Sequence, residues 1–341
     1  MKFGPVHLAE AEGKILGHNL ADAVGKRLLR KGHALGPEEI ETLRGLGRRR
    51  VYVAELQAGD VDENAAARRV ARACQGEGVR LSSATTGRVN LIATVLGLAR
   101  IDAERLAALN QTEGLTLATV KGHSVARPGQ TVATAKIISY ALPEAVVTQA
   151  ETMARNAGPL IRVDELKARR VGLILYGAPS VRERLTESFS PLAERVRSLG
   201  SEVVELDYVN LEDEDGEERL VKALRCLQKE RVNLVVLAGE TAIMDRQDVT
   251  PRAVERAGGR IETVGAPVDP GNLLMLAYLD DVPVLGAPGC ARSRKVNVID
   301  WILPRLLVGE VLGRADIAVL GAGGLLDDVP ERRMPRSIIG T

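Results

Sequence analysis

The second half of the chain alternates short apolar runs with longer amphipathic stretches. The apolar runs predict strands at residues 171–176, 202–206, 233–238, 260–264, 282–286 and 317–320. The amphipathic stretches predict helices at residues 181–199, 211–230, 250–257 and 292–308. Strands that alternate with helices of this length favour a mostly parallel sheet covered by helices on both faces. We therefore expect an α/β fold here, a doubly wound three-layer sandwich.

The first half has a less regular pattern, which predicts a smaller α+β region. Helices are expected from Pro37, across residues 60–74 and from Pro143, and strands at residues 51–55, 115–120 and 131–138. The Gly158-Pro159 pair ends the last helix and is the expected domain boundary. The predicted division is residues 1–158 for the α+β region, 159–330 for the α/β domain and 331–341 for a tail.

Composition narrows the class of protein. Among 341 residues there are two Phe, one Trp and five Tyr, so aliphatic side chains must fill the core. A formal net charge of +1 gives no global attraction to nucleic acid or to a membrane surface. Three cysteines without a Cys-x-x-Cys spacing argue against a disulfide framework or a structural zinc site. No apolar stretch of the sequence reaches the roughly 20 residues that span a bilayer, so we expect a cytoplasmic protein.

Ligands of open parallel sheets bind at the carboxyl ends of the strands, so the segments after the strands are the first candidates for a site. Residues 238–251 follow the third predicted strand and carry Asp245 and Asp248. Two carboxylates on one loop can bind Mg²⁺ and leave its other positions to water and phosphate. Alternatively, Asp248 caps the following helix and Asp245 is solvated. The sequence leaves both interpretations open.

Two further segments lie at the same predicted edge. Asp269, Pro270, Gly271 and Asn272 form a strong turn signal, and the glycine would let the backbone approach a flat ligand. Residues 286–295 lead into a predicted helix, whose first turn would contain Arg292, Ser293, Arg294 and Lys295. Cations there oppose the positive end of the helix dipole unless an anion lies between them, which indicates phosphate binding. The alternative is a solvated basic turn.

Cys290 stands in the same predicted turn, where neighbouring cations could lower the pKa of its thiol. In the N-terminal half, Arg88 and Lys136 could reach an anion or could be ordinary turn and edge residues. The four histidines, at positions 7, 18, 33 and 123, do not resemble a metal-ligand cluster.

The order and spacing of these segments resemble the molybdopterin-binding domain of the MogA/MoaB and MoeA families. Gly-Glu-Thr-Ala-Ile-Met-Asp at 239–245 is similar to the GGVSVGD loop of MoeA proteins, and Asp-Val-Thr-Pro at 248–251 to the RDVTP of MogA/MoaB proteins. Asp-Pro-Gly-Asn at 269–272 and Pro-Gly-Cys-Ala-Arg-Ser at 288–293 stand where MoeA proteins carry PGKP and PGNP. Residues 22–55 resemble the MoeA lead-in more weakly.

The resemblance implies a protein of molybdenum cofactor biosynthesis. Its ligand would be molybdopterin, a flat pterin with a dithiolene and a terminal phosphate, or the adenylylated form. As a molybdopterin molybdenumtransferase it would use Mg²⁺, with the catalytic and metal-binding roles falling by position to Asp245 and Asp248. The resemblance assigns cofactor binding to Gly239, Glu240, Asp269, Gly271, Asn272, Pro288, Gly289, Arg292 and Ser293. It also allows a homo-oligomer, and a molybdenum cofactor nucleotidyltransferase or a molybdoenzyme as partner.

Two departures from the family pattern bear on catalysis. Glu240 replaces the second glycine of its loop and adds bulk and negative charge. Tyr-Gly-Ala-Pro-Ser at 176–180 stands in place of a TGDEL-like segment and lacks its acidic pair. These changes favour an alternative function, a non-catalytic molybdenum cofactor carrier or regulatory module for a partner nucleotidyltransferase. A third alternative is a CinA-like nucleotide hydrolase, since that family shares the fold.

Overall fold

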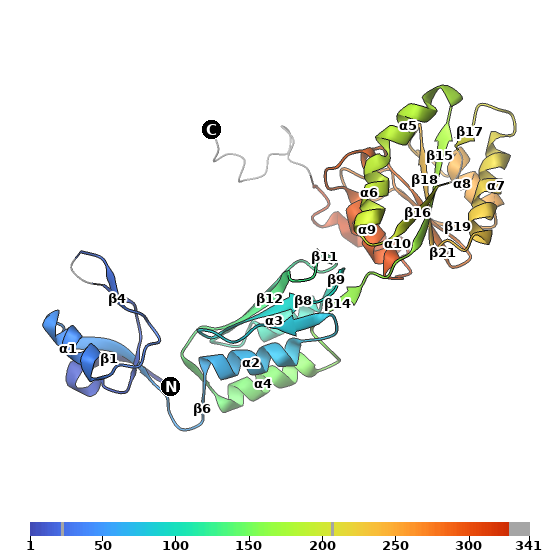
Figure 1. Ribbon diagram of the computed structural model, residues 1–341. Coiled ribbons are helices and arrows are strands. Elements are labelled where there is room, and N and C mark those ends of the chain that lie inside the picture. Colours follow the sequence, from blue (N-terminus) through green and yellow to red (C-terminus); the bar gives the residue numbers. More distant parts are fainter. Residues whose placement is uncertain (22–23, 206–207, 327–341) are drawn as a thin grey trace. The chain divides into compact units, whose positions relative to one another are not determined.

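The computed structural model describes residues 1–21, 24–205 and 208–326 (Figure 1). The chain divides into two compact units, Met1–Asp164 and Glu165–Thr341. Strand β14 (Ile161–Glu165) ends the first unit, so the boundary predicted after residue 158 lies just before this strand. The tail predicted at 331–341 lies outside the described residues. Each unit has a hydrophobic core of its own.

The first unit begins with a small antiparallel sheet in the order β1-β5-β2. Its strands are β1 (Lys2–His7), β2 (Ile15–Leu16) and β5 (Arg50–Glu55), with a short helical turn η1 (Leu8–Glu10) after the first. Helix α1 (Pro37–Gly45) has a proline at its start and buries Ile40 and Leu43 in the core of this sheet, as its sequence predicts. The hairpin of β3 (Leu20–Ala21) and β4 (Arg27–Leu29) completes this part.

The rest of the first unit packs helices on the antiparallel sheet β10-β12-β8-β7. Asp62 caps helix α2 through hydrogen bonds from the amides of Asn64 and Ala65, so the helix predicted from residue 60 begins at Glu63. Small buried side chains of α2, among them Ala66 and Ala67, let it lie close to the sheet. The elements are β6 (Asp60–Asp62), α2 (Glu63–Cys74), β7 (Val79–Leu81), β8 (Arg88–Ala93), β9 (Gly97–Ile101), α3 (Ala103–Leu109), β10 (Leu115–Thr119), β11 (Val125–Ala126), β12 (Thr131–Ile137), β13 (Ala141–Pro143) and α4 (Glu144–Arg155).

The second unit contains one large sheet in the order β16-β15-β18-β21-β20-β19, with β17 also paired to β15. The strands are β15 (Arg170–Gly177), β16 (Glu202–Glu205), β17 (Val209–Asn210), β18 (Leu234–Gly239), β19 (Arg260–Val264), β20 (Met275–Leu279) and β21 (Val282–Gly286). Pairing is parallel from β16 to β21 and antiparallel at β20 and β19. The α/β class agrees with the prediction, but the sheet is mixed because the chain forms β20, which the sequence pattern did not predict.

Helices cover the sheet of the second unit. They are α5 (Arg182–Ser188), α6 (Ser190–Ser198), α7 (Gly216–Lys229), α8 (Val249–Arg256), α9 (Val298–Leu307) and α10 (Arg314–Ala318). Figure 1 shows α7 and α8 on one side of the sheet, and α5, α6 and α9 on the other. Buried side chains of α7 and α8 form one continuous core with the strands. Within the described residues, no helix is both long and apolar enough to cross a membrane.

Some predicted elements of this unit are wrong in extent or type. The helix predicted at 181–199 is divided into α5 and α6 at the buried Phe189, after the short turn η2 (Pro179–Val181). The helix predicted from residue 211 begins only at Gly216. The strand predicted at 317–320 is wrong, because α10 and the turn η4 (Val319–Gly321) occupy these residues. A short apolar run does not distinguish a strand from a helical segment, and here the Asp316 carboxylate caps a helix by accepting from the Gly313 amide.

Candidate functional site

The loops that carry the predicted site residues meet at one edge of the large sheet. Tyr176 pairs with Gly239 in β15 and β18, and Leu237 pairs with Gly286 in β18 and β21, so the carboxyl ends of these strands lie side by side. Met275, the first residue of β20, pairs antiparallel with Gly286. The segments 239–248, 265–274 and 287–297 therefore leave the sheet at the same edge, where open α/β sheets bind ligands.

Glu240 joins the loop after β18 to the loop after β15. Its backbone amide donates to the carbonyl oxygen of Tyr176 at 3.0 Å, and its carboxylate accepts from the amide of Ala178 at 3.1 Å. The Tyr208 hydroxyl donates to the carbonyl oxygen of the same Ala178 at 2.8 Å. Burial, and then the negative charge of Glu240, raise the pKa of Tyr208. Glu240 thus fixes the loop in which the acidic pair of the TGDEL-like segment is missing.

A buried hydrogen bond joins the start of α8, which follows the loop after β18, to the end of β15. Thr250, in the first turn of α8, donates from its hydroxyl to the Tyr176 hydroxyl oxygen at 2.7 Å. Burial raises the pKa of Tyr176 to about 12, so this phenol stays protonated at neutral pH. The contact holds the start of α8 against the end of β15.

Asp245 and Asp248 are both engaged within their own loop. One carboxylate oxygen of Asp248 accepts from the amides of Met244 and Asp245, at 2.5 and 3.0 Å. One carboxylate oxygen of Asp245 accepts from the amide of Gln247 at 2.8 Å. Asp248 stands at the N-cap position of α8 but makes no side-chain cap hydrogen bond to it. The second oxygen of each carboxylate takes no part in these three hydrogen bonds, and Mg²⁺ sites often use only one or two carboxylates.

The described residues hold no group of three or more His, Cys, Asp or Glu side chains arranged to bind a metal. Any Mg²⁺ bound between Asp245 and Asp248 would therefore take most of its ligands from water and from the phosphate of a substrate.

The turn at 269–272 is packed between the start of α9 and the segment 321–326. Gly271 has a φ of +141°, and a Cβ atom there would lie 2.4 Å from the Cβ of Val298, so glycine is needed for packing. The Val298 amide donates to the carbonyl oxygen of Pro270 at 3.2 Å. The Asp269 amide donates to the carbonyl oxygen of Gly324 at 2.7 Å. The turn leaves Asn272 exposed at the edge of the sheet.

The loop after β21 differs from the prediction in a way that removes one argument for phosphate binding. Gly289–Arg292 forms a short 3-10 turn, and α9 begins only at Val298. Arg294 and Lys295 therefore precede the helix and do not lie in its first turn, so the argument from the helix dipole no longer holds as predicted. Arg294 pairs with Glu194 at 2.8 Å instead. Burial raises the pKa of the Cys290 thiol, in contrast to the lowered value expected beside a helix start.

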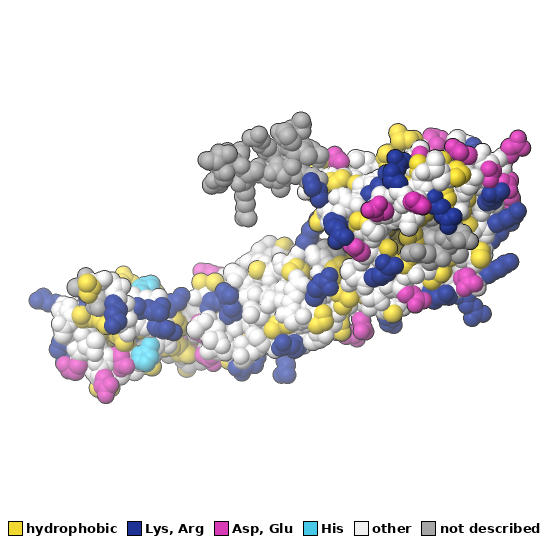
Figure 2. Space-filling model, turned by 45° about the horizontal axis from the view of Figure 1, so that its top comes forward, with side chains coloured by type: hydrophobic (Ala, Val, Ile, Leu, Met, Phe, Trp, Pro, Cys, Tyr) yellow, Lys and Arg dark blue, Asp and Glu magenta, His cyan; other side chains and the backbone are white. Residues whose placement is uncertain are grey.

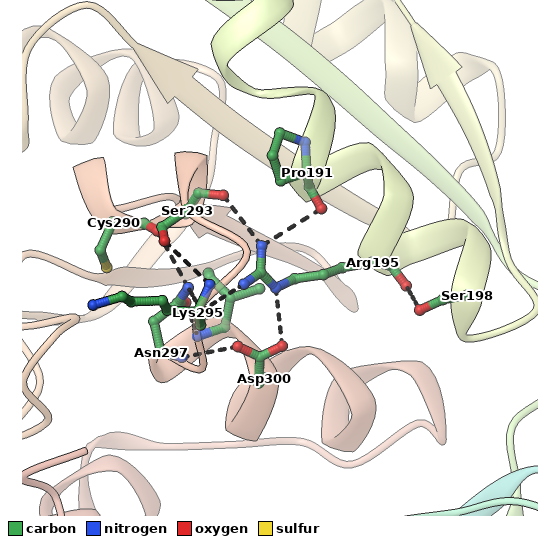
Figure 3. A network of polar contacts seen from close by, with 10 residues as sticks. Pro191, Arg195, Ser198, Cys290, Ser293, Lys295, Asn297 and Asp300 are labelled. Atoms are coloured by element: carbon green, nitrogen blue, oxygen red, sulfur yellow. Dashed lines mark hydrogen bonds and ion pairs between the residues drawn. The ribbon is translucent and has the colours of Figure 1, made fainter. Parts of the chain in front are cut away.

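Asn297 and Arg195 shape this loop (Figure 3). The Asn297 side chain is buried, accepts from the Ile299 amide at 3.0 Å and donates to the carbonyl oxygens of Cys290 and Lys295. Asp300 completes a capping box by accepting from the Asn297 amide at 2.8 Å and also accepts from Nε of Arg195 at 2.9 Å. Arg195 donates in turn to the carbonyl oxygen of Lys295.

Asn297 and Arg195 were not among the site residues predicted from the sequence. An asparagine three residues before an aspartate is a capping signal that could have placed the start of α9 correctly. No local signal points to Arg195, which reaches the loop from α6.

Arg292 connects the loop after β21 to the loop after β18. Its Nη2 donates to the carbonyl oxygens of Gly239 and Glu240, at 2.9 and 3.2 Å. Its guanidinium carbon lies 4.8 Å from the centre of the Phe189 ring, within cation–π range. Its Nε is buried and has no hydrogen-bond partner among the described residues. Arg292 thus holds two of the loops together, and its buried Nε can still donate a hydrogen bond.

The comparisons with known proteins give distant likenesses. A family model described as a domain of unknown function (DUF8806) matches residues 5–55, and no curated protein matches the chain. One similar solved structure is a molybdenum cofactor biosynthesis protein from Pyrococcus furiosus, at 13% identity and a TM-score of 0.25, covering 93% of this chain and 65% of that protein. This chain thus spans less than two thirds of the length of that protein.

Two further structures are of the same kind. A molybdopterin biosynthesis MoeA protein from Pyrococcus horikosii has 13% identity and a TM-score of 0.30 over 90% of this chain and 75% of its own. A molybdenum cofactor biosynthesis protein B has 19% identity and a TM-score of 0.27 over 43% of this chain and 89% of its own. TM-scores this low assign neither a fold family nor an activity, so the function has to be argued from the site itself.

Proposed function

We propose that the Glu165–Thr341 unit binds molybdopterin or its adenylylated form as part of molybdenum cofactor biosynthesis. The observation that carries the proposal is the meeting of the three motif-bearing loops at one sheet edge, with Arg292 crossing from the third loop to Gly239 and Glu240 in the first. These are the segments that resemble the MoeA and MogA/MoaB motifs. The proposal includes the finer fold assignment, a doubly wound sandwich of the MogA/MoaB type.

The proposed ligand orientation follows from the chemistry of each loop. The pterin lies at Gly239, Glu240, Asp269, Gly271 and Asn272, where a turn and a glycine backbone offer a flat surface. The phosphate lies toward Pro288, Gly289, Arg292 and Ser293, where Arg292 supplies a fixed positive charge. Because Arg292 is already held by two carbonyl oxygens and by Phe189, it would lose little side-chain freedom when the ligand binds.

Asp245 and Asp248 are the proposed Mg²⁺ ligands. Each carboxylate has one oxygen outside the hydrogen bonds of the loop, which suits a cation shared with water and phosphate. A bound Mg²⁺ would neutralise phosphate charge at this edge. The protein's own contribution is to hold the two carboxylates in place through the backbone amides of Met244, Asp245 and Gln247.

The second candidate function is a non-catalytic carrier or regulatory module that passes the finished cofactor to a nucleotidyltransferase or a molybdoenzyme. The specific observation in its favour is Glu240, whose carboxylate is committed to the Ala178 amide and adds negative charge beside the proposed pterin position. A charge fixed there favours binding without turnover of a phosphorylated ligand.

Titration calorimetry of the full chain with molybdopterin and with adenylylated molybdopterin, with and without Mg²⁺ and molybdate, tests both functions. Tight binding followed by AMP release on adding molybdate establishes a molybdenumtransferase. Binding without AMP release establishes the carrier or regulatory module. Absence of binding to either pterin refutes the proposal for this unit.

Two substitutions test the assignment of the site. Arg292→Ala is expected to weaken binding about tenfold to a hundredfold, the usual loss for a hydrogen bond to a charged group. Arg294→Ala removes a neighbouring arginine paired with Glu194 and serves as the control, with binding unchanged. Asp248→Asn keeps an acceptor for the amides of Met244 and Asp245 but removes charge, so it should abolish only the Mg²⁺-dependent part of binding.

A further inference from the structure

The first unit gathers aromatic side chains at one place. The ring of Phe3 lies 5.7 Å from that of His18 in an edge-to-face arrangement and 6.1 Å from that of Tyr52. The Tyr140 ring is nearly parallel to that of Phe3, at 24° and 6.4 Å between centres. In a chain with two Phe and five Tyr, this concentration is not a consequence of composition. Phe3 and Tyr52 are each 48% exposed, so the cluster is not a closed core.

A hollow of about 540 Å³ opens beside this cluster. Phe3, His18, Lys31 and Tyr140 contribute to its lining. The Tyr140 hydroxyl donates to the carbonyl oxygen of Gly17 at 2.7 Å, which fixes the orientation of its ring. A Cβ atom at Gly17 would lie 2.8 Å from the Phe3 ring, so the glycine is what lets this ring lie flat against the backbone. The volume lies within the usual range of small-molecule sites.

Lys31 is the basic side chain of the lining, and it belongs to a basic stretch of the chain. Lys31 follows the β3–β4 hairpin, on which Lys26, Arg27 and Arg30 are also exposed. The backbone amide of Lys31 donates to the Asn19 side chain at 2.9 Å, which anchors this end of the hairpin. Glu113 is an exposed acidic residue of the lining. Figure 2 shows dark blue, yellow and cyan side chains next to one another on the part of the surface formed by the N-terminal residues.

A second group of charged residues lies near Lys31 and Tyr140. Lys31 interacts electrostatically with Glu63 and Lys136, which approach each other to 3.7 Å. Burial lowers the pKa of Lys136, and burial likewise raises the pKa of Glu63. Titratable groups shifted by burial next to an aromatic hollow are typical of binding sites.

We infer that this hollow binds a planar ring that carries a phosphate, of which a mononucleotide is the simplest example. Phe3 and Tyr140 offer ring faces to a base, and stacking of this kind is tolerant of base identity. Lys31 provides the charge for the phosphate. The hollow has the size for a single nucleotide, which favours a mononucleotide over a longer nucleic acid strand. This site is separate from the one proposed in the Glu165–Thr341 unit.

Titration calorimetry of the full chain with AMP, GMP, CMP and UMP tests the inference, with adenosine and inorganic phosphate as partial ligands. We expect at least one nucleotide to bind, and each partial ligand to bind more weakly than that nucleotide. Phe3→Leu should weaken nucleotide binding about tenfold, because it removes one stacking face and keeps the apolar volume. Lys31→Gln should weaken it about threefold or more and reduce its dependence on salt.

Two control variants locate the binding. Arg27→Gln removes a charge from the same hairpin but not from the lining, and should bind like the parent. Arg294→Ala alters the other unit outside its proposed ligand site and should also bind like the parent. Phe3→Leu must keep the circular dichroism spectrum and thermal midpoint of the parent, as expected for a half-exposed side chain.

The inference is overturned if no nucleotide binds, or if phosphate alone binds as tightly as the nucleotides. It is also overturned if Arg292→Ala abolishes nucleotide binding while Phe3→Leu leaves it intact, since the nucleotide would then occupy the second unit.

Discussion

Tyr176 occupies the space that a side chain at Gly239 would need. The two residues are partners across β15 and β18, and a Cβ atom on Gly239 would lie 2.2 Å from the Tyr176 ring. Gly289, at the start of the 3-10 turn after β21, is exposed, and a Cβ atom there meets nothing within 4 Å. Gly239 is therefore required for packing. Gly289 is not, and only a bound ligand could make a glycine necessary there.

This difference predicts the effect of two matched substitutions. Gly239→Ala should lower the free energy of unfolding by about 1–3 kcal/mol, because the buried Tyr176 ring has to move. Gly289→Ala should change it by less than about 0.5 kcal/mol. Urea unfolding of both variants measures the difference, and equal losses would show that the Tyr176 ring does not constrain Gly239. If the proposed phosphate position is correct, Gly289→Ala should still weaken pterin binding.

At this scale, the sequence indicates which residue types are present but not what each one contacts. The Asp248 carboxylate fits both a metal ligand and a helix cap in the sequence, and in the structure it accepts from two amides that precede it. Arg195 could not be found, because its partners Asp300 and Lys295 are distant in the chain. Such contacts depend on how α6 and α9 pack, which no local pattern encodes.

At the scale of elements, patterns predicted the existence of helices and strands better than their ends. The run Met275–Leu279 contains no Val, Ile or Thr, whereas the equally buried β18, which was predicted, contains two valines, so β20 was missed. Helix α9 was predicted to begin near Arg292, although its capping box places the start after Asn297. The difference matters for function, because it decides whether the cations of the third loop lie on a helix or before it.

Asn297 has two structural roles that substitutions can separate. Asn297→Ala removes the cap of α9 and leaves the carbonyl oxygens of Cys290 and Lys295 without their donor, so it should cost about 1–2 kcal/mol or more. Asn297→Ser keeps a capping oxygen and loses only the amide donors, so it should cost less. Trp301, the single tryptophan of the chain, lies on α9, and its fluorescence during urea unfolding reports on this helix. Equal losses for the two variants would mean that the cap contributes nothing.

At the scale of the whole molecule, the alternation of strands and helices predicts a boundary after residue 158, and the chain forms two compact units, Met1–Asp164 and Glu165–Thr341. The buried apolar residues of the first unit lie in two clusters, one of them on the small β1-β5-β2 sheet, and those of the second unit form a core of their own. Proteins with separate cores commonly unfold in more than one step. A substitution in the core of one unit is therefore expected to destabilise that unit alone.

Scanning calorimetry is accordingly expected to show two transitions. Arg69 joins α2 to α4 through ion pairs with Glu144 and Glu151, at 2.8 and 2.7 Å, so Arg69→Ala should lower only the transition of the first unit. Asn297→Ala should lower only that of the second. A single transition that both variants shift together would show that the units unfold cooperatively.

The antiparallel return of β20 places a single connecting segment at the edge of the sheet where the candidate site lies. A parallel strand beside β21 would need a crossover connection of about a dozen residues or more, whereas β20 and β19 begin and end at the carboxyl edge through the segment 265–274. The exposed positions of this segment, Pro267 and Asn272, can change without altering the parallel strands, whereas Gly271 is fixed by its packing against Val298 of α9. Relatives with the same sheet could therefore differ in ligand preference through this one connection, which makes it the natural segment to exchange when specificity is to be changed.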